Sequence, residues 1–170
     1  MSLLPLLLLA AAGWLSAQQP PLHEVCGACH NEQSTDLQEH AHFAGGITCD
    51  GCHGESKPHR EATGHKPPDQ VAGPAEQPAV CGRCHGGIAK EYVASKHGQR
   101  VMARSEKRAA SCTTCHGTHS QRMPAAMETQ CNRCHAGLPA SCKKDPPPGK
   151  AAAKPVCAGC HSPHSLTIRP

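Results

Sequence analysis

One short motif, Cys-x-x-Cys-His, occurs six times in the 170 residues of this chain. Two thiols at this spacing can each add to a vinyl group of one haem, and the histidine that follows can bind the iron. Zinc ribbons and thioredoxin-like redox sites also use Cys-x-x-Cys, but neither requires that histidine. Structural disulfides would explain only the cysteines. The motif therefore predicts six covalently attached c-type haems.

The motifs use twelve of the thirteen cysteines and six of the fourteen histidines. The predicted thioether positions are Cys26, Cys29, Cys49, Cys52, Cys81, Cys84, Cys112, Cys115, Cys131, Cys134, Cys157 and Cys160. The predicted proximal iron ligands are His30, His53, His85, His116, His135 and His161. The remaining cysteine, Cys142, is interpreted either as an ordinary surface thiol or as a bridge to a second chain.

The composition is too poor in apolar residues for a core made of side chains. After residue 17, Leu, Ile, Val and Phe together number fourteen, and Phe43 and Tyr92 are the only aromatic residues. Such a chain cannot offset its backbone entropy by burial alone, whereas six porphyrins would supply large apolar surfaces. We therefore predict a mostly irregular fold with a few short α-helices and essentially no β-sheet, whose core is formed by the haems.

Residues 1–17 contain an apolar run from Leu3 to Leu15 that is too short to span a bilayer comfortably. It predicts a secretory signal cleaved near Ala17, with an uncleaved membrane anchor as the alternative. Export to the periplasm or the outside of a bacterium fits attachment of c-type haem outside the cytoplasm. The formal charge of +4 is outweighed by about twelve haem propionates, so it predicts no nucleic-acid partner.

Pro-rich stretches divide the rest of the chain. Residues 66–78 and 143–155 are interpreted as linkers. They separate a haem 1–2 module at 18–65, a haem 3–5 module at 79–142 and a haem 6 segment at 156–170. The best helix candidate runs from Ile88 to Arg108, with Val93, His97 and Val101 on one apolar side.

An internal repeat relates the motifs. In two units a histidine follows the first cysteine by sixteen residues, at His42 after Cys26 and at His97 after Cys81. Both units open with Cys-Gly-x-Cys-His and close with Cys-x-x-Cys-His-Gly. A third, degraded unit spans motifs 5 and 6, in which His164 matches His119.

The run Ser95-Lys96-His97-Gly98, with a trailing Cys-His-Gly-x-His, resembles the doubled-CxxCH multihaem cytochromes c, a group related to the respiratory tetrahaem cytochromes c. The resemblance covers residues 23–164 and is strongest over 81–119. It implies bis-histidine ligation and closely spaced haems. This chain departs from the pattern by lacking a mid-unit histidine between motifs 5 and 6 and by carrying Cys142.

The resemblance and the repeat together suggest distal iron ligands among the eight histidines outside the motifs. Five positions match it: His42, His59, His97, His119 and His164. The sixth ligand is expected to be His23 or His65, with His40 as the third choice. Three methionines, Met102, Met123 and Met127, are alternatives that would raise the potential of the haem concerned.

A chain with six bis-histidine haems is expected to carry electrons between redox partner proteins rather than to catalyse a reaction. The alternatives are a nitrite- or hydroxylamine-type reductase with one open haem, and a subunit that stacks into a haem filament. Contact with a membrane redox complex and homo-oligomerisation are both compatible with the sequence. Its donor and acceptor have no sequence signature.

Overall fold

A computed structural model of the chain describes residues 22–104, 110–135 and 157–168. Within these ranges it contains eleven short α-helices, and the only β structure there is an isolated bridge between His161 and Ile168. The predicted fold class, short helices in a largely irregular chain without a sheet, is confirmed for the described residues. The leader, Cys142 and the second linker lie outside them.

Most of the helices are only one or two turns long. Their bounds are α1 Leu22–Gly27, α2 Asn31–Gln38, α3 Ala41–Ala44, α4 Cys49–His53, α5 Lys57–Glu61, α6 Gln77–Cys81, α7 Gly86–Ala94, α8 Lys96–Met102, α9 Cys112–His116, α10 Pro124–Cys134 and α11 Cys157–Cys160. Helices this short are unstable in isolation, so their stability must come from what packs against them.

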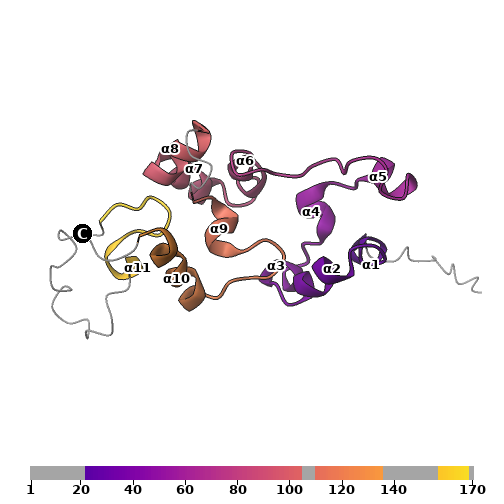
Figure 1. Cartoon of the computed structure of the whole chain (residues 1–170), viewed down its shortest axis with the longest axis horizontal. Coiled ribbons are helices and arrows are strands. Elements are labelled where there is room, and N and C mark those ends of the chain that lie inside the picture. The colour runs from indigo at the N-terminus through magenta and orange to yellow at the C-terminus, as the bar shows by residue number, and fades with distance from the viewer. Residues whose placement is uncertain (1–21, 105–109, 136–156, 169–170) are drawn as a thin grey trace, which may run out of the picture.

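The helices form an elongated, open arrangement (Figure 1). Helices α5, α6, α7 and α8 follow one long edge, α1, α2, α3, α10 and α11 follow the other, and α4 and α9 lie between. Helix α1 packs on α2 and α4, α7 packs on α6 and α8, and α10 packs on α9 and α11. The two helices between the edges each carry one complete Cys-x-x-Cys-His motif.

Side chains alone form almost no core. Among the described residues, only Tyr92 and Val101 are buried hydrophobic residues, at 8% and 4% exposure, and none is less than 2% exposed. Large apolar side chains such as Ile168, 77% exposed, and Val71, 71% exposed, remain at the protein surface. This distribution agrees with an interior completed by covalently bound haems.

The single helix expected from Ile88 to Arg108 is wrong. The chain instead breaks at Ser95, which adopts an extended conformation and separates α7 from α8. The Ser95 side chain accepts a hydrogen bond from the Gly98 backbone N–H at 3.1 Å and so caps α8. The break changes the helical register, which leaves Val93 37% exposed while Val101 is buried.

Gly98 allows the two helices to meet. A Cβ atom at this position would lie 2.0 Å from the Tyr92 carbonyl oxygen and 2.7 Å from the Val93 Cα. These are backbone atoms, which cannot rotate away as a side chain could. The Ser-x-His-Gly sequence therefore has a physical basis: the serine starts α8 and the glycine lets α8 pack on α7. His97 lies between these two residues in the first turn of α8.

We expect Gly98→Ala to lower the free energy of unfolding of the holoprotein by about 1–3 kcal/mol, because the added methyl group forces the two helices apart. The matched control is Gly87→Ala in α7, where an added Cβ meets no atom within 4 Å. Chemical denaturation followed by circular dichroism measures both variants. Equal stability of the two would contradict this account of the α7–α8 contact.

The internal repeat is visible in the backbone. Helices α4 and α9 are both five residues long and both end at a glycine directly after the motif histidine. Gly54 has φ 72° and ψ 177°, and Gly117 has φ 83° and ψ 177°. Positive φ disfavours residues with a Cβ atom, which explains why both units close with Cys-x-x-Cys-His-Gly.

Candidate haem-binding sites

Each Cys-x-x-Cys-His motif forms a single helical turn. Motifs 2 and 4 make up α4 and α9, and in the other four the backbone N–H of the motif histidine donates to the carbonyl of the first cysteine at 2.9 Å. Residues three and four apart share one face of a helix, so both sulfurs and the imidazole lie on the same side of the turn. This placement fits two thioether bonds and one iron ligand to a single porphyrin.

Five of the six motif histidines lie opposite a histidine from outside the motifs. The pairs, with the distances between ring centroids, are His30–His59 at 6.0 Å, His42–His85 at 5.9 Å, His53–His119 at 6.1 Å, His97–His135 at 6.0 Å and His116–His164 at 6.0 Å. Their ring planes lie within 34° of parallel. The five histidines that the resemblance suggested as distal ligands are the five found in these pairs.

The common separation fits a metal between the rings. Two metal–nitrogen bonds of about 2.0–2.1 Å, extended to the ring centroids, place two coordinated imidazoles about 6 Å apart. Directly stacked rings lie closer, as His40 and His42 do at 4.6 Å. Each pair also joins one motif histidine to one that is not in a motif, as bis-histidine ligation requires. The described residues thus fit haem iron between the rings.

Backbone carbonyls orient several of these rings. The Nδ1 atom lies 2.9 Å from the Gln70 carbonyl in His53, 2.6 Å from the Lys66 carbonyl in His59 and 3.1 Å from the Leu166 carbonyl in His161. A neutral imidazole that donates Nδ1–H to a carbonyl directs its Nε2 lone pair elsewhere, which is the usual second-shell arrangement for a metal-bound histidine.

Burial favours the neutral form of several of these histidines. It lowers the pKa of His116 and of His119, and the neighbouring His164 and His53 respectively lower them further. Burial and the adjacent His42 likewise lower the pKa of His40. The neutral imidazole is the form that coordinates a metal, so this environment suits ligation.

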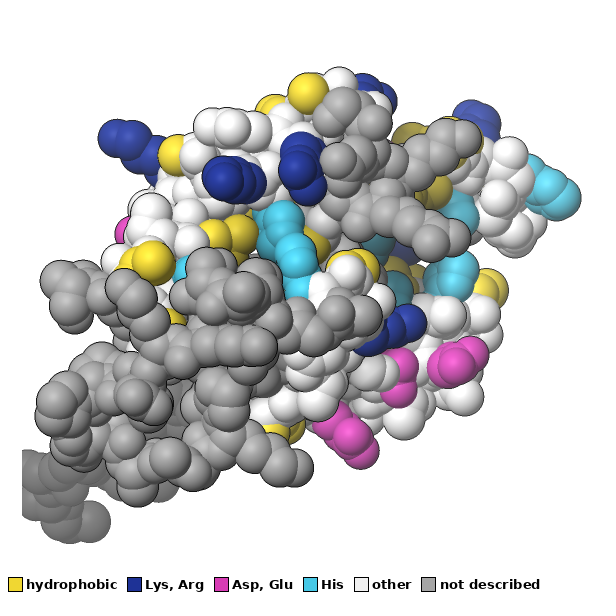
Figure 2. All heavy atoms as spheres, turned by 60° about the vertical axis from the view of Figure 1, so that its left-hand side comes forward, with side chains coloured by type: hydrophobic (Ala, Val, Ile, Leu, Met, Phe, Trp, Pro, Cys, Tyr) yellow, Lys and Arg dark blue, Asp and Glu magenta, His cyan; other side chains and the backbone are white. Residues whose placement is uncertain are grey.

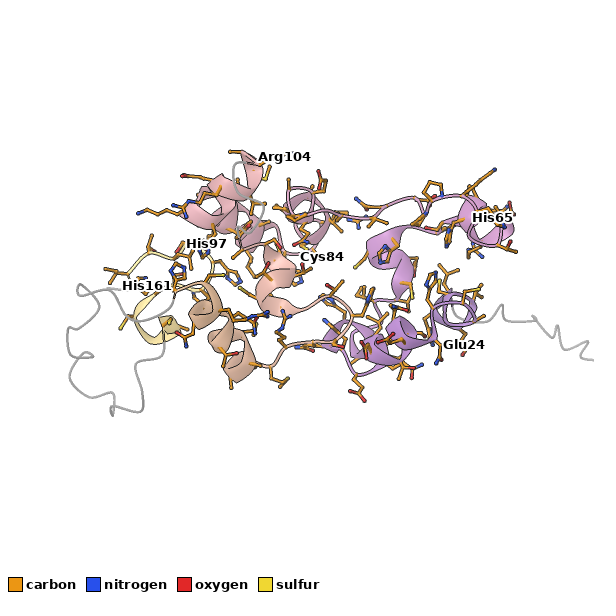
Figure 3. The ribbon with its side chains drawn as sticks, viewed as in Figure 1. Glu24, His65, Cys84, His97, Arg104 and His161 are labelled. Atoms are coloured by element: carbon orange, nitrogen blue, oxygen red, sulfur yellow. The ribbon has the colours of Figure 1, made fainter. Side chains whose placement is uncertain are left out.

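The three remaining histidines from outside the motifs have other surroundings. His23 contacts the edge of Phe43 with ring centroids 4.8 Å apart, and its Nδ1 is buried without a hydrogen-bond partner. His40 caps α3, because its Nδ1 accepts from the His42 N–H at 3.0 Å. His65 is exposed and lies at the end of the molecule opposite to His161 (Figure 3). None of the three forms a described ring pair with His161.

Consecutive motifs lie next to one another. The Cys26 and Cys49 thiols lie close enough to interact, and so do the Cys81 and Cys112 thiols. Burial, followed by these neighbours, raises the pKa of Cys49 and of Cys112 to about 11. Burial also raises the pKa of Cys52 and Cys115, with smaller contributions from Cys81 and Cys134 respectively. These pKa shifts apply to thiols that are not bonded to haem. The contacts between the cysteines place consecutive motifs side by side, so motifs 1 to 5 follow one another in space in the order of the sequence.

The histidine pairs connect distant parts of the chain. His42–His85 and His53–His119 join residues 18–65 to residues 79–142, and the Arg83 guanidinium donates to the Gly51 carbonyl at 2.8 Å between the same regions. The division of the chain into haem modules stays a prediction. The regions assigned to the haem 1–2 module and the haem 3–5 module are in contact. Figure 2 shows several histidine side chains across the middle of the face in view.

The segment 66–78 contributes more than a connection. Besides the Gln70 carbonyl at His53, the Asp69 carboxylate accepts from the Ser56 N–H at 2.8 Å. The buried Gln77 side chain donates to the Thr113 hydroxyl at 3.0 Å and accepts from the Thr113 N–H at 3.1 Å, which ties α6 to α9. No sequence signal could have identified the role of the Gln70 carbonyl, because any residue carries that group.

The zinc alternative receives no support from the described residues. They contain no group of three or more His, Cys, Asp or Glu side chains placed to hold one metal ion. Instead they offer paired imidazoles beside exposed or half-buried thiols. Short helical turns carrying Cys-x-x-Cys-His, and histidines paired at about 6 Å, define a multihaem c-type cytochrome.

A family model described as cytochrome c3 matches residues 41–136, which is more than half of the chain. The chain therefore belongs to the cytochrome c3 family of multihaem electron-transfer cytochromes. No curated protein and no solved structure gives a significant match. Among the described helices, none is long and apolar enough to cross a membrane.

Proposed function

We propose that this protein is an exported hexahaem cytochrome that passes electrons between redox partner proteins through closely spaced haems. The observation that supports it best is the set of five histidine pairs with centroid separations of 5.9–6.1 Å. Six haems in one chain of this length leave little protein between neighbours. Each haem would supply a one-electron ferric/ferrous couple.

The chain's own residues suit electron transfer rather than substrate chemistry. At five of the six haems, two imidazoles from opposite sides would saturate the iron. A substrate could not reach the metal of these haems. Because each pair would bind its iron from both faces, no ligand has to be gained or lost when the iron changes charge. An unchanged ligand set keeps the reorganisation that accompanies electron transfer small.

The order of the motifs supports a continuous path. The contacts between Cys26 and Cys49 and between Cys81 and Cys112 bring the attachment points of haems 1 and 2, and of haems 3 and 4, together. Helix α10 contacts both α9 and α11, which places motif 5 between motifs 4 and 6. Electrons could thus enter near one end of the molecule and leave near the other.

The reductase alternative is less well supported. Such enzymes surround an open haem with tyrosine, lysine or arginine side chains that assist the chemistry. The only tyrosine, Tyr92, donates its hydroxyl hydrogen to the Ala110 carbonyl at 2.8 Å, and burial raises its pKa to about 12. The Tyr92 hydroxyl therefore connects α7 to the segment before α9.

Haem content and redox behaviour test the proposal. The intact mass of the mature protein is expected to exceed that of the polypeptide by six haems, and a spectroelectrochemical titration should reduce all six reversibly. Peptide mapping should find a haem on every motif. A chain that carried zinc, or that had fewer than six haems in fully matured protein, would contradict it.

The place of the protein in the cell is part of the same proposal. Export to the periplasm or the cell exterior fits the family and the predicted leader at 1–17. Its partners would be other redox proteins, and a membrane redox complex is one candidate. Fractionation of cells followed by haem staining of the separated proteins would locate it.

A further inference from the structure

Motif 6 differs from the other five in its histidine environment. All fourteen histidines of the sequence lie within the described residues, and ten of them form the five pairs. His161 is the only motif histidine without a described histidine partner. Its Nδ1 lies 3.1 Å from the Leu166 carbonyl, the same kind of contact that orients His53. His161 is thus prepared as a proximal ligand.

The nearest candidate for a distal ligand, His164, is used elsewhere. Its ring faces His116 at 6.0 Å with planes only 10° apart. The tight loop that follows motif 6 holds this arrangement, with the Ser162 N–H donating to the Thr167 carbonyl and the Leu166 N–H to the Ser162 carbonyl, both at 2.8 Å. Motif 4 shows the same division, since His119 pairs with His53 rather than with an iron bound to His116.

The three histidines that belong neither to a motif nor to one of the five pairs lie elsewhere in the molecule. His65 lies at the opposite end in Figure 3, and His23 belongs to α1, which also lies at the end away from α11 in Figure 1, whereas His40 flanks α3 near the middle of the molecule. Both are also engaged locally, His23 against Phe43 and His40 as the cap of α3.

We infer that the haem attached at Cys157 and Cys160, with His161 as its only histidine ligand, is a binding site for small neutral diatomic molecules such as carbon monoxide or nitric oxide. This inference rests on the proposed function, because it needs a haem at motif 6. The described segment 157–168 itself contains no charged residue, which favours a neutral ligand over an anion. Ferrous iron with one imidazole ligand binds such molecules, whereas bis-histidine iron excludes them.

The first test uses the mature, fully reduced wild-type protein. Carbon monoxide is expected to bind with a stoichiometry of one per six haems and to shift about one sixth of the Soret absorbance. The oxidised protein should show a high-spin electron paramagnetic resonance signal from one haem, with the other five low-spin. Peptide mapping of the same sample shows whether the Cys157–Cys160 peptide carries its haem.

Two variants locate the binding site. Removing haem 6 with Cys157→Ser and Cys160→Ser together should abolish both the carbon monoxide shift and the high-spin signal. The matched control, Cys131→Ser with Cys134→Ser, removes haem 5 and should leave both in place. If either variant fails to mature, the wild-type stoichiometry and spin state still decide.

The outcomes separate this inference from the proposed function. Six haems with no carbon monoxide shift and no high-spin signal would overturn the inference alone, since some other group would then bind the sixth iron. A shift that persists without haem 6 would also overturn it. A motif 6 peptide without haem would overturn both the inference and the six-haem function.

Discussion

Without haem attachment the polypeptide is expected to remain unfolded. A form lacking residues 1–17, made in a cytoplasm that cannot attach c-type haem, should show a disordered far-ultraviolet circular dichroism spectrum. It should also unfold without a cooperative thermal transition. The reference is the mature holoprotein in the same buffer, for which we expect helical circular dichroism and a cooperative transition.

The magnitude of this effect follows from the burial. Tyr92 and Val101 are the only buried hydrophobic residues in the described part of the chain. Burying one such side chain contributes about 1.5–3 kcal/mol. Fixing the backbone costs about 1–2 kcal/mol for every residue that becomes ordered. Side-chain burial therefore falls far short of the entropy cost, and covalently bound porphyrins are needed to make up the difference.

A cooperative transition in the haem-free chain would contradict this conclusion, because it would show that the polypeptide carries a core of its own. Restoring haem attachment by export of the same chain provides the positive control. The comparison of the two forms also separates folding from solubility. If the haem-free chain aggregates, it can be dissolved in denaturant and refolded, and it should still lack the native circular dichroism spectrum.

The second large effect is expected from His59→Ala. The His59 ring lies 6.0 Å from that of His30, and its Nδ1 contacts the Lys66 carbonyl. Without this imidazole the haem bound by His30 would lose its second ligand. We expect the reduced variant to bind one more equivalent of carbon monoxide than the wild type does, and one low-spin haem of the oxidised protein to become high-spin.

The same substitution should lower stability, because the His30–haem–His59 connection would no longer link the two segments. A disulfide that closes a loop of comparable length contributes roughly 2–4 kcal/mol to the free energy of unfolding, and we expect a loss of similar size here. Chemical denaturation measures this loss. The matched control is His65→Ala, an exposed histidine in the same region for which no ring pair is described.

We expect His65→Ala to leave the carbon monoxide stoichiometry and the spin states unchanged. If His65→Ala opened a haem and His59→Ala did not, the assignment of His59 as the partner of His30 would be wrong. If neither did, another side chain must occupy that position, which would place the pairing scheme as a whole in doubt.

The residue order alone determined the local part of each predicted haem site. A cysteine at the start of a helical turn, another three residues later and a histidine directly after it share one face whatever the rest of the chain does. The scarcity of apolar residues likewise determined that cofactors must complete the core. Both conclusions depend only on short-range geometry and on composition, and the order of the residues contains both in full.

Tertiary structure decided the rest. The repeat and the resemblance indicated which histidines outside the motifs are candidate ligands, but not that His42 faces His85 or that His53 faces His119. These partners are far apart in the sequence, and their spacing does not show which histidine faces which. The break at Ser95, the Gln70 carbonyl at His53 and the lack of a described histidine opposite His161 are also properties of packing, because each depends on which backbone comes near.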